Sequence, residues 1–189
     1  PDWLEPALQA QLLTEGRERA RRGELRPARV GRVEALRRAE DVRGDAIQWL
    51  DTSDPADCVQ TLLMRMDALR AALNEQLFLG VVETELHFAH YPPGAGYQRH
   101  LDRFRSDDAR VISTVMHLGD PWCRDHGGEL RIFLDGPDGE IHVDIAPIPG
   151  QLVLFVSAEI EHEVLPTRRD RYSVTGWMRR RPLGGSVHR

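Results

Sequence analysis

Eight short segments separated by turn residues occupy the chain from residue 84 to residue 179. The stretches between them, such as "PPGAG", "DGPDG" and "PIPG", are rich in glycine and proline. Many short strands joined by such turns are typical of a sandwich or barrel, and eight strands fit a jelly roll, or double-stranded β-helix. The predicted strands are residues 84–91, 97–103, 110–118, 129–134, 140–145, 151–156, 161–166 and 171–179.

The first part of the chain predicts helices instead. Leu4, Leu8 and Leu12 form a helical stripe in a segment that ends near residue 23. A second stripe at steps of three and four residues predicts a helix that Asp54 caps and in which Pro55 takes the first position. Its members are Val59, Leu62, Met66, Leu69, Leu73 and Leu77. These helices would cover one face of the jelly roll.

The simplest organisation is one domain over residues 1–189, since a chain of this length can bury a substantial core. Within it we expect residues 1–80 to supply helical support and a mobile loop, and residues 84–180 to form the jelly-roll core. The loop is the charged segment that precedes "AIQWL", which predicts a further strand.

Bulk properties exclude several classes of function. No apolar run approaches the length of a membrane span and no stretch resembles a signal peptide, so we expect no membrane partner. Cys58 and Cys123 can form neither a disulfide framework nor a metal site, and a reducing cytoplasm is the expected location. A net charge of −5 argues against binding nucleic acid through a general basic surface.

The stretch "YQRHLDRF" places His100 and Asp102 two residues apart in a predicted strand. Their side chains would share a face, with Leu101 turned the other way. Such an isolated pair is more often a hydrogen-bonded surface pair than a metal site. His162, at the start of the seventh predicted strand, favours the metal site, because the second and seventh strands of a jelly roll can be neighbours. Two imidazoles and one carboxylate are typical of non-haem Fe(II) oxygenases and leave three coordination positions open.

Arg171 is the candidate partner for a cosubstrate at that metal. A 2-oxo acid can occupy two open positions and leave one for O2, but its distal carboxylate needs a cation. Arg171 lies nine residues after His162, and we expect it on the facing strand of a hairpin. A guanidinium there can bind a carboxylate through two hydrogen bonds. Thr175, on the same strand face, could add a hydroxyl hydrogen bond.

The region from about residue 43 to residue 178 resembles the 2-oxoglutarate-dependent prolyl hydroxylases. It is most similar to the hypoxia-inducible-factor prolyl hydroxylases and their bacterial relatives. The matching stretches are "RGDAIQWL", "YPPGAGYQRHLD", "GGELRIF" and "HEVLPTRRDRYSVTGW". The resemblance implies that His100, Asp102 and His162 bind Fe(II), and that Arg171 binds the C5 carboxylate of 2-oxoglutarate.

The resemblance also implies that Tyr91 and Thr175 line the cosubstrate pocket and that Trp177 closes one wall. The stretch "VRGD" matches the end of a mobile segment that folds over the substrate in that family. Arg43 and Asp45 are the candidate anchors of this segment.

Three other histidines require separate interpretation. Where the relatives carry a tyrosine that contacts the 2-oxoglutarate carboxylate, this chain has His117. An imidazole can donate the same hydrogen bond, with a charge that depends on pH, and a core or surface histidine is the open alternative. His87 and His90 lie on opposite faces of a predicted strand, so they cannot both join one site.

The function implied by the resemblance is an Fe(II)- and 2-oxoglutarate-dependent dioxygenase. It would convert 2-oxoglutarate and O2 to succinate and CO2 and hydroxylate a prolyl residue of a protein or peptide to 4-hydroxyproline. A translation factor is a candidate target, and ascorbate is a further candidate cofactor. One alternative keeps the chemistry but acts on a free amino acid, another small metabolite or an alkylated base. The other is a non-redox, cupin-like enzyme or sensor that holds Zn²⁺ or another divalent ion.

Overall fold

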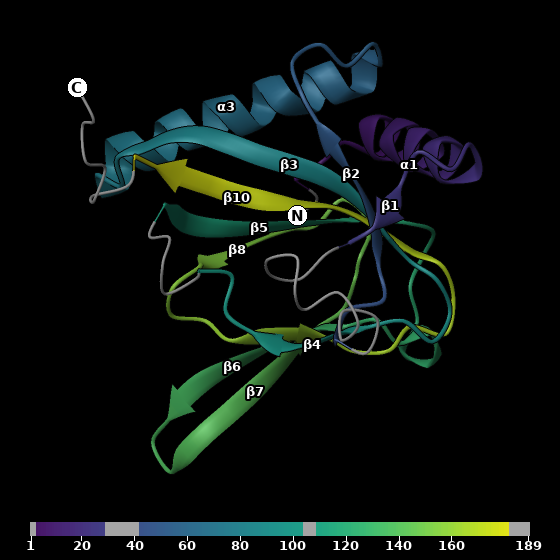
Figure 1. Ribbon diagram of the computed structural model, residues 1–189. Helices are drawn as coiled ribbons and strands as arrows, with labels where there is room; N and C mark the ends of the chain where they lie inside the picture. The colour runs from purple at the N-terminus through teal and green to yellow at the C-terminus, as the bar shows by residue number, and fades with distance from the viewer. Residues whose placement is uncertain (1–2, 29–41, 104–108, 182–189) are drawn as a thin grey trace, which may run out of the picture.

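The computed structural model describes residues 3–28, 42–103 and 109–181, and consists of two antiparallel sheets with two long helices on one side (Figure 1). The elements are α1 (Pro6–Arg21), β1 (Arg26–Pro27), β2 (Ala46–Leu50), α3 (Asp57–Leu77), β3 (Val81–Tyr91), β4 (Tyr97–His100), β5 (Arg110–Leu118), the 3-10 helix η2 (Arg124–His126), β6 (Leu130–Gly136), β7 (Gly139–Ile145), β8 (Leu152–Val156), β9 (His162–Val164) and β10 (Arg171–Arg180).

The strands form a six-stranded sheet in the order β1-β2-β3-β10-β5-β8 and a four-stranded sheet in the order β4-β9-β6-β7. This arrangement confirms the predicted jelly roll, in which all eight expected strands form. Helices α1 and α3 cover the outer face of the six-stranded sheet, as the position of their apolar stripes in the first half of the chain predicted (Figure 1). None of the described helices is long and apolar enough to cross a membrane.

Period-two alternation along β3 and β10 divides the apolar residues between two cores. Leu86 and Phe88 of β3 pack with Leu8, Leu12 and other helical residues in the core under the helices. Ala89 and Tyr91 point the opposite way and join Leu130, Val164 and others in the core between the sheets. The residues on this second face reach the site described below, because successive side chains on a strand alternate between faces.

The central strand β10 passes very close to β3. A Cβ atom at Gly176 would collide with the carbonyl oxygen of Glu85, so only glycine fits at this position. The close approach holds Thr175 and Trp177, the neighbours of Gly176, at fixed positions on the sheet.

The structure corrects three expectations. The strand predicted at 97–103 ends at His100, so Asp102 lies in a bend after β4. β9 and β10 belong to different sheets, so Arg171 is not on a hairpin with His162. The chain instead crosses from one sheet to the other between them. Most of the loop expected to be mobile falls at residues 29–41, outside the described residues.

The third correction concerns Asp54. Helix α3 begins at Asp57 with Ala56 as its N-cap, so Asp54 does not cap it. The carboxylate of Asp54 instead accepts two hydrogen bonds of 2.7 Å from the guanidinium of Arg19. The side chains are 5% and 7% exposed for Arg19 and Asp54. This ion pair fastens α1 to the segment that leads into α3, and Asp54 Oδ1 also accepts a hydrogen bond of 3.0 Å from the backbone N–H of Ala56.

Candidate metal centre

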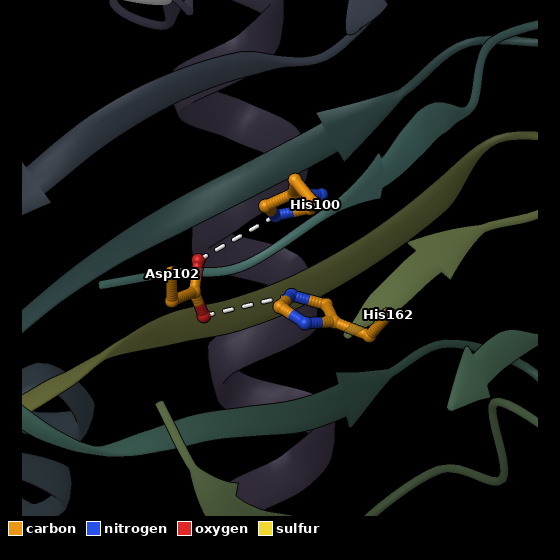
Figure 2. Close-up of side chains that lie close together, drawn as sticks. All are labelled: His100, Asp102 and His162. Atoms are coloured by element: carbon orange, nitrogen blue, oxygen red, sulfur yellow. Dashed lines mark ion pairs between the residues drawn. The ribbon is translucent and has the colours of Figure 1, made fainter. Parts of the chain in front are cut away.

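Strand pairing brings the two histidines of the predicted metal site together. β4 and β9 are antiparallel neighbours, and their register places His100 directly opposite His162. Directly opposed residues share a face of the sheet, so both imidazoles point into the space between the two sheets. Asp102, just beyond the end of β4, points toward both rings (Figure 2). The sequence prediction that these three residues meet is confirmed.

Backbone carbonyl groups fix the orientation of both rings. His100 Nδ1 lies 2.7 Å from the carbonyl oxygen of Gln98, and His162 Nδ1 lies 3.2 Å from that of Ile160. A carbonyl can only accept, so each Nδ1 carries the proton and each Nε2 keeps a free lone pair. Such outer contacts are typical of metal-binding histidines, because they hold the tautomer that can coordinate.

The carboxylate of Asp102 lies between the two Nε2 atoms. Oδ1 is 3.5 Å from His100 Nε2, and Oδ2 is 3.5 Å from His162 Nε2. Burial alone would raise the pKa of Asp102, but the neighbouring imidazoles of His100 and His162 and the hydrogen bond from the Ser113 hydroxyl outweigh it. Because the pKa is lowered overall, Asp102 is a carboxylate at neutral pH.

A pair of buried serines supports Asp102 from behind. Ser113 Oγ donates to Asp102 Oδ2 over 2.6 Å, and Ser157 Oγ lies 2.9 Å from Ser113 Oγ. Since the proton of Ser113 is used on the carboxylate, Ser157 is the donor to Ser113. The hydrogen bond occupies a lone pair of Oδ2 and leaves Oδ1 free, which favours binding of a metal through one carboxylate oxygen.

This donor set fits a divalent transition metal. The three ligand atoms lie within 4.8 Å of one another, and burial lowers the pKa of His162, so its imidazole is neutral. Two imidazoles and one carboxylate suit Fe(II), and three ligands on one side leave other positions open. The arrangement can therefore hold an ion that also binds small molecules.

A cavity between the sheets contains the three ligands and Arg171 in its walls. Arg171 is buried, and its contacts are Gly128 O at 2.9 Å, Ser173 Oγ at 3.4 Å and the ring of Tyr91. None of the described residues pairs its guanidinium with a carboxylate at hydrogen-bond distance. Burial accordingly lowers the pKa of Arg171 from its ordinary value. A buried cation that faces a cavity without a counter-ion is suited to an anionic ligand.

His117 lies next to this arginine. Its Nδ1 is 3.4 Å from Arg171 Nη2, and the residue is not part of the cavity wall. Burial, with a contribution from Arg171, lowers the pKa of His117 well below its ordinary value, so it is neutral near pH 7. Arg171 can only donate, so Nδ1 accepts and Nε2 carries the proton. That Nε2–H is buried and has no described partner.

Four of the five other residues implied by the resemblance line the cavity, and the fifth lies behind it. Tyr91, Thr175 and Trp177 line the cavity, as expected. Arg43 also lines it and forms an ion pair with Asp45, with nitrogen–oxygen distances of 2.6 and 2.7 Å. Asp45 is buried behind Arg43 and does not line the cavity.

Sequence reasoning missed several residues of the site. His87 lies in the cavity wall and contacts the rings of Trp49 and Trp177, and burial lowers its pKa to about 4. His90 faces the other side of β3, against Asp170, as the alternation predicted. His87 shares strand parity with Tyr91, so the same alternation could have placed it in the site. No local signal marked Ser113, since its contact with Asp102 depends on the packing of β5.

Comparison with known proteins supports this geometry. Residues 86–179 match the family model described as the 2OG-Fe(II) oxygenase superfamily. Among curated proteins, human Egl nine homolog 1 is 34% identical over 146 residues, which is 74% of this chain and 33% of that protein. Mouse prolyl hydroxylase EGLN3 is 33% identical over 162 residues, or 82% of this chain and 66% of that protein. The chain thus spans between a third and two thirds of these relatives.

Solved structures agree over nearly the whole chain. A Pseudomonas putida prolyl-4-hydroxylase superposes with a TM-score of 0.85 and 47% identity, and covers 95% of this chain and 90% of its own. A Trichoplax adhaerens prolyl hydroxylase, solved with a peptide fragment of the hypoxia inducible factor oxygen degradation domain, gives a TM-score of 0.84 at 26% identity. The match covers 94% of this chain and 80% of that one.

Proposed function

Because this chain belongs to the 2OG-Fe(II) oxygenase superfamily, among its prolyl hydroxylases, we propose that it hydroxylates a prolyl residue of a protein or peptide. When bound, Fe(II) and 2-oxoglutarate supply the oxidation of a substrate C–H bond by O2, with succinate and CO2 as the other products. His100, Asp102 and His162 hold the metal, and Arg171 holds the C5 carboxylate of the cosubstrate.

The observation that carries the proposal is the buried guanidinium of Arg171 in the same cavity as the three ligands. A non-redox metal enzyme or sensor has no use for a carboxylate-binding cation at that position. The chemistry of 2-oxoglutarate needs both a metal with open positions and such a cation. The pairing of the two features therefore favours the oxygenase over the cupin-like alternative.

The other side chains of the cavity orient ligands and exclude water. Tyr91 and Thr175 lie beside Arg171 on the same wall, and Thr175 Oγ1 is 3.3 Å from Ser173 Oγ. His117 supports Arg171 from behind, so its role for the cosubstrate is indirect in this geometry. Trp177 closes the wall above the ligands, with the guanidinium of Arg110 stacked 3.5 Å from its ring. These groups exclude water from the metal.

The prolyl substrate is proposed from the relatives, since both solved neighbours are prolyl hydroxylases by name. A translation factor as target and ascorbate as reductant belong to the same proposal. So does a cytoplasmic location, with which the free thiols of Cys58 and Cys123 are compatible.

Product analysis tests the proposal. The purified protein, supplied with Fe(II) and 2-oxoglutarate under air, should form succinate. Mass spectrometry should then find an added oxygen on proline in peptides but not on free proline. Added oxygen on free proline alone would favour the small-metabolite alternative. A protein that binds metal but never forms succinate would overturn the oxygenase assignment.

A further inference from the structure

Three apolar side chains continue the face of the metal site out to the free edge of the four-stranded sheet. They are Leu134 of β6 with Ile141 and Val143 of β7, and we refer to them as the apolar shelf. In the register, Ile132 stands opposite both His162 and Val143, and Leu134 stands opposite Ile141. The metal ligand His162 and the shelf therefore point to the same side of the sheet.

The shelf lacks the cover that the rest of this face has. Ile132 and Ile145, on the same face, pack against the core between the sheets. Ile141 and Val143 are 49% and 44% exposed, and the three shelf residues belong to neither core of the described structure. In Figure 1 the β6–β7 hairpin extends away from the helices, beyond the short strands β4 and β9.

The positions of Arg171, the metal site and the shelf along β6 indicate which ligand can reach the shelf. Arg171 binds the carbonyl oxygen of Gly128, just before β6 begins. His162 stands opposite Ile132, and the shelf residue Leu134 comes next on the same face. The metal site thus lies between the cation that holds the cosubstrate and the shelf. A substrate must approach from the side that the cosubstrate does not occupy, which is the side of the shelf.

We propose that the shelf binds an apolar side chain of the peptide substrate that flanks the target proline. This inference rests on the proposed prolyl hydroxylase function and adds a specificity surface to it. The charge at the tip of the hairpin restricts the partner further, because Asp138 in its turn forms no ion pair with residues that the structure describes. The partner is an extended segment with an apolar residue and without acidic neighbours.

Sheet geometry gives the spacing between that residue and the proline. Across the sheet, Ile141 is two strands from His162, which is about 10 Å. Along β7, Ile141 is two residues from Val143, the residue in line with His162, which is about 7 Å. The diagonal is about 12 Å, which an extended peptide spans with three or four residues at about 3.3 Å each. The preferred apolar residue therefore stands three or four positions from the proline.

Peptide turnover by matched variants tests the proposal. The probes are synthetic 12-residue peptides with one central proline, in which leucine or serine stands at each flanking position in turn. For the wild type, serine three or four residues from the proline on one side should lower kcat/KM about tenfold. In the double variant Ile141→Ser/Val143→Ser the two peptides should be turned over alike. Ile148→Ser, at an equally exposed isoleucine (49%), is the control and should keep the preference.

The outcomes separate the shelf from the proposed function. In the double variant, metal affinity and 2-oxoglutarate oxidation without peptide should match those of the wild type. If the double variant does not fold, the single variant Ile141→Ser replaces it in the test. A leucine preference that survives in the variants, or no preference at those positions, overturns the shelf but not the function. Succinate formation without hydroxylation of any peptide overturns both. A wild-type dimer that the double variant dissociates, with peptide preference unchanged, would identify the surface as a contact between copies and overturn the proposal.

Discussion

Removal of the Ser113 hydroxyl should weaken metal binding without unfolding the protein. Ser113 Oγ donates to the buried carboxylate of Asp102 over 2.6 Å. A hydrogen bond to a charged group contributes about 1.5–3 kcal/mol. In Ser113→Ala we therefore expect the Kd for Co(II) or Mn(II) to rise about 10- to 100-fold, in line with losses of outer-shell partners. Without this hydrogen bond Asp102 Oδ2 can also bind the metal, so the carboxylate is no longer held to binding through one oxygen. The visible spectrum of the Co(II) protein should therefore change.

Calorimetric titration of the metal-free protein measures the affinity, with thermal unfolding as the check on folding. Ser113→Thr keeps a hydroxyl at this position and should retain most of the affinity. In an Asp102→Ala background, loss of the Ser113 hydroxyl should have no further effect, because its acceptor is gone. A Kd for Ser113→Ala within twofold of the wild type, with an unchanged Co(II) spectrum, would refute the positioning role.

Three further predictions follow from the contacts described. Arg171→Ala should raise the Kd for 2-oxoglutarate about a hundredfold or more, with Mn(II) affinity unchanged, because a buried carboxylate loses its cation; calorimetry on the Mn(II)-loaded protein would show otherwise if Arg171 lies outside the site. The pKa of His87 falls from 6.5 to about 4 on folding, so only the unfolded chain takes up a proton in that range. The contribution of the neutral, buried His87 to the free energy of unfolding of the metal-free protein should thus be fully present above pH 6.5 and shrink by about 3 kcal/mol toward pH 4. His87→Met should remove this part of the pH dependence, and an unchanged pH slope in the variant would contradict the reasoning. Asp54→Ala should cost about 2–3 kcal/mol, or roughly 5–10 °C in Tm, since it removes two hydrogen bonds from the buried guanidinium of Arg19 and leaves only the one to Glu15; the paired change Arg19→Met/Asp54→Leu should cost much less, and equal losses would disprove the explanation.

Sequence reasoning predicted the strands well because strand signals are local. Alternation of apolar residues and the turn residues between segments can be read within a few positions, and all eight expected strands form. The same parity placed Thr175 on the face of Arg171 and separated His87 from His90. The failures lie at segment ends, where Asp102 falls beyond β4 and Asp54 fails to cap α3. At both positions the side chain bonds a partner far away in the sequence, Ser113 for Asp102 and Arg19 for Asp54, which no local pattern shows.

For the site, the spacing of the ligands indicated the chemistry, but the surroundings of the ligands could not be predicted. His100, Asp102 and His162 were identifiable because few functions need two imidazoles and a carboxylate on adjoining strands. The neutral state of His117 was not, since it arises from complete burial against Arg171.

The residue pattern alone predicted a β-rich jelly roll, three candidate metal ligands and a candidate cation for an acidic cosubstrate. Each of these follows from the types of side chain present and from their short or regular spacing in the sequence. Folding in three dimensions settled which strands became neighbours, so that His100 meets His162, Arg171 crosses to the opposite sheet and Ser113 reaches Asp102. Pairings between residues far apart in the chain depend on the summed packing of both sheets, and no local pattern encodes that sum.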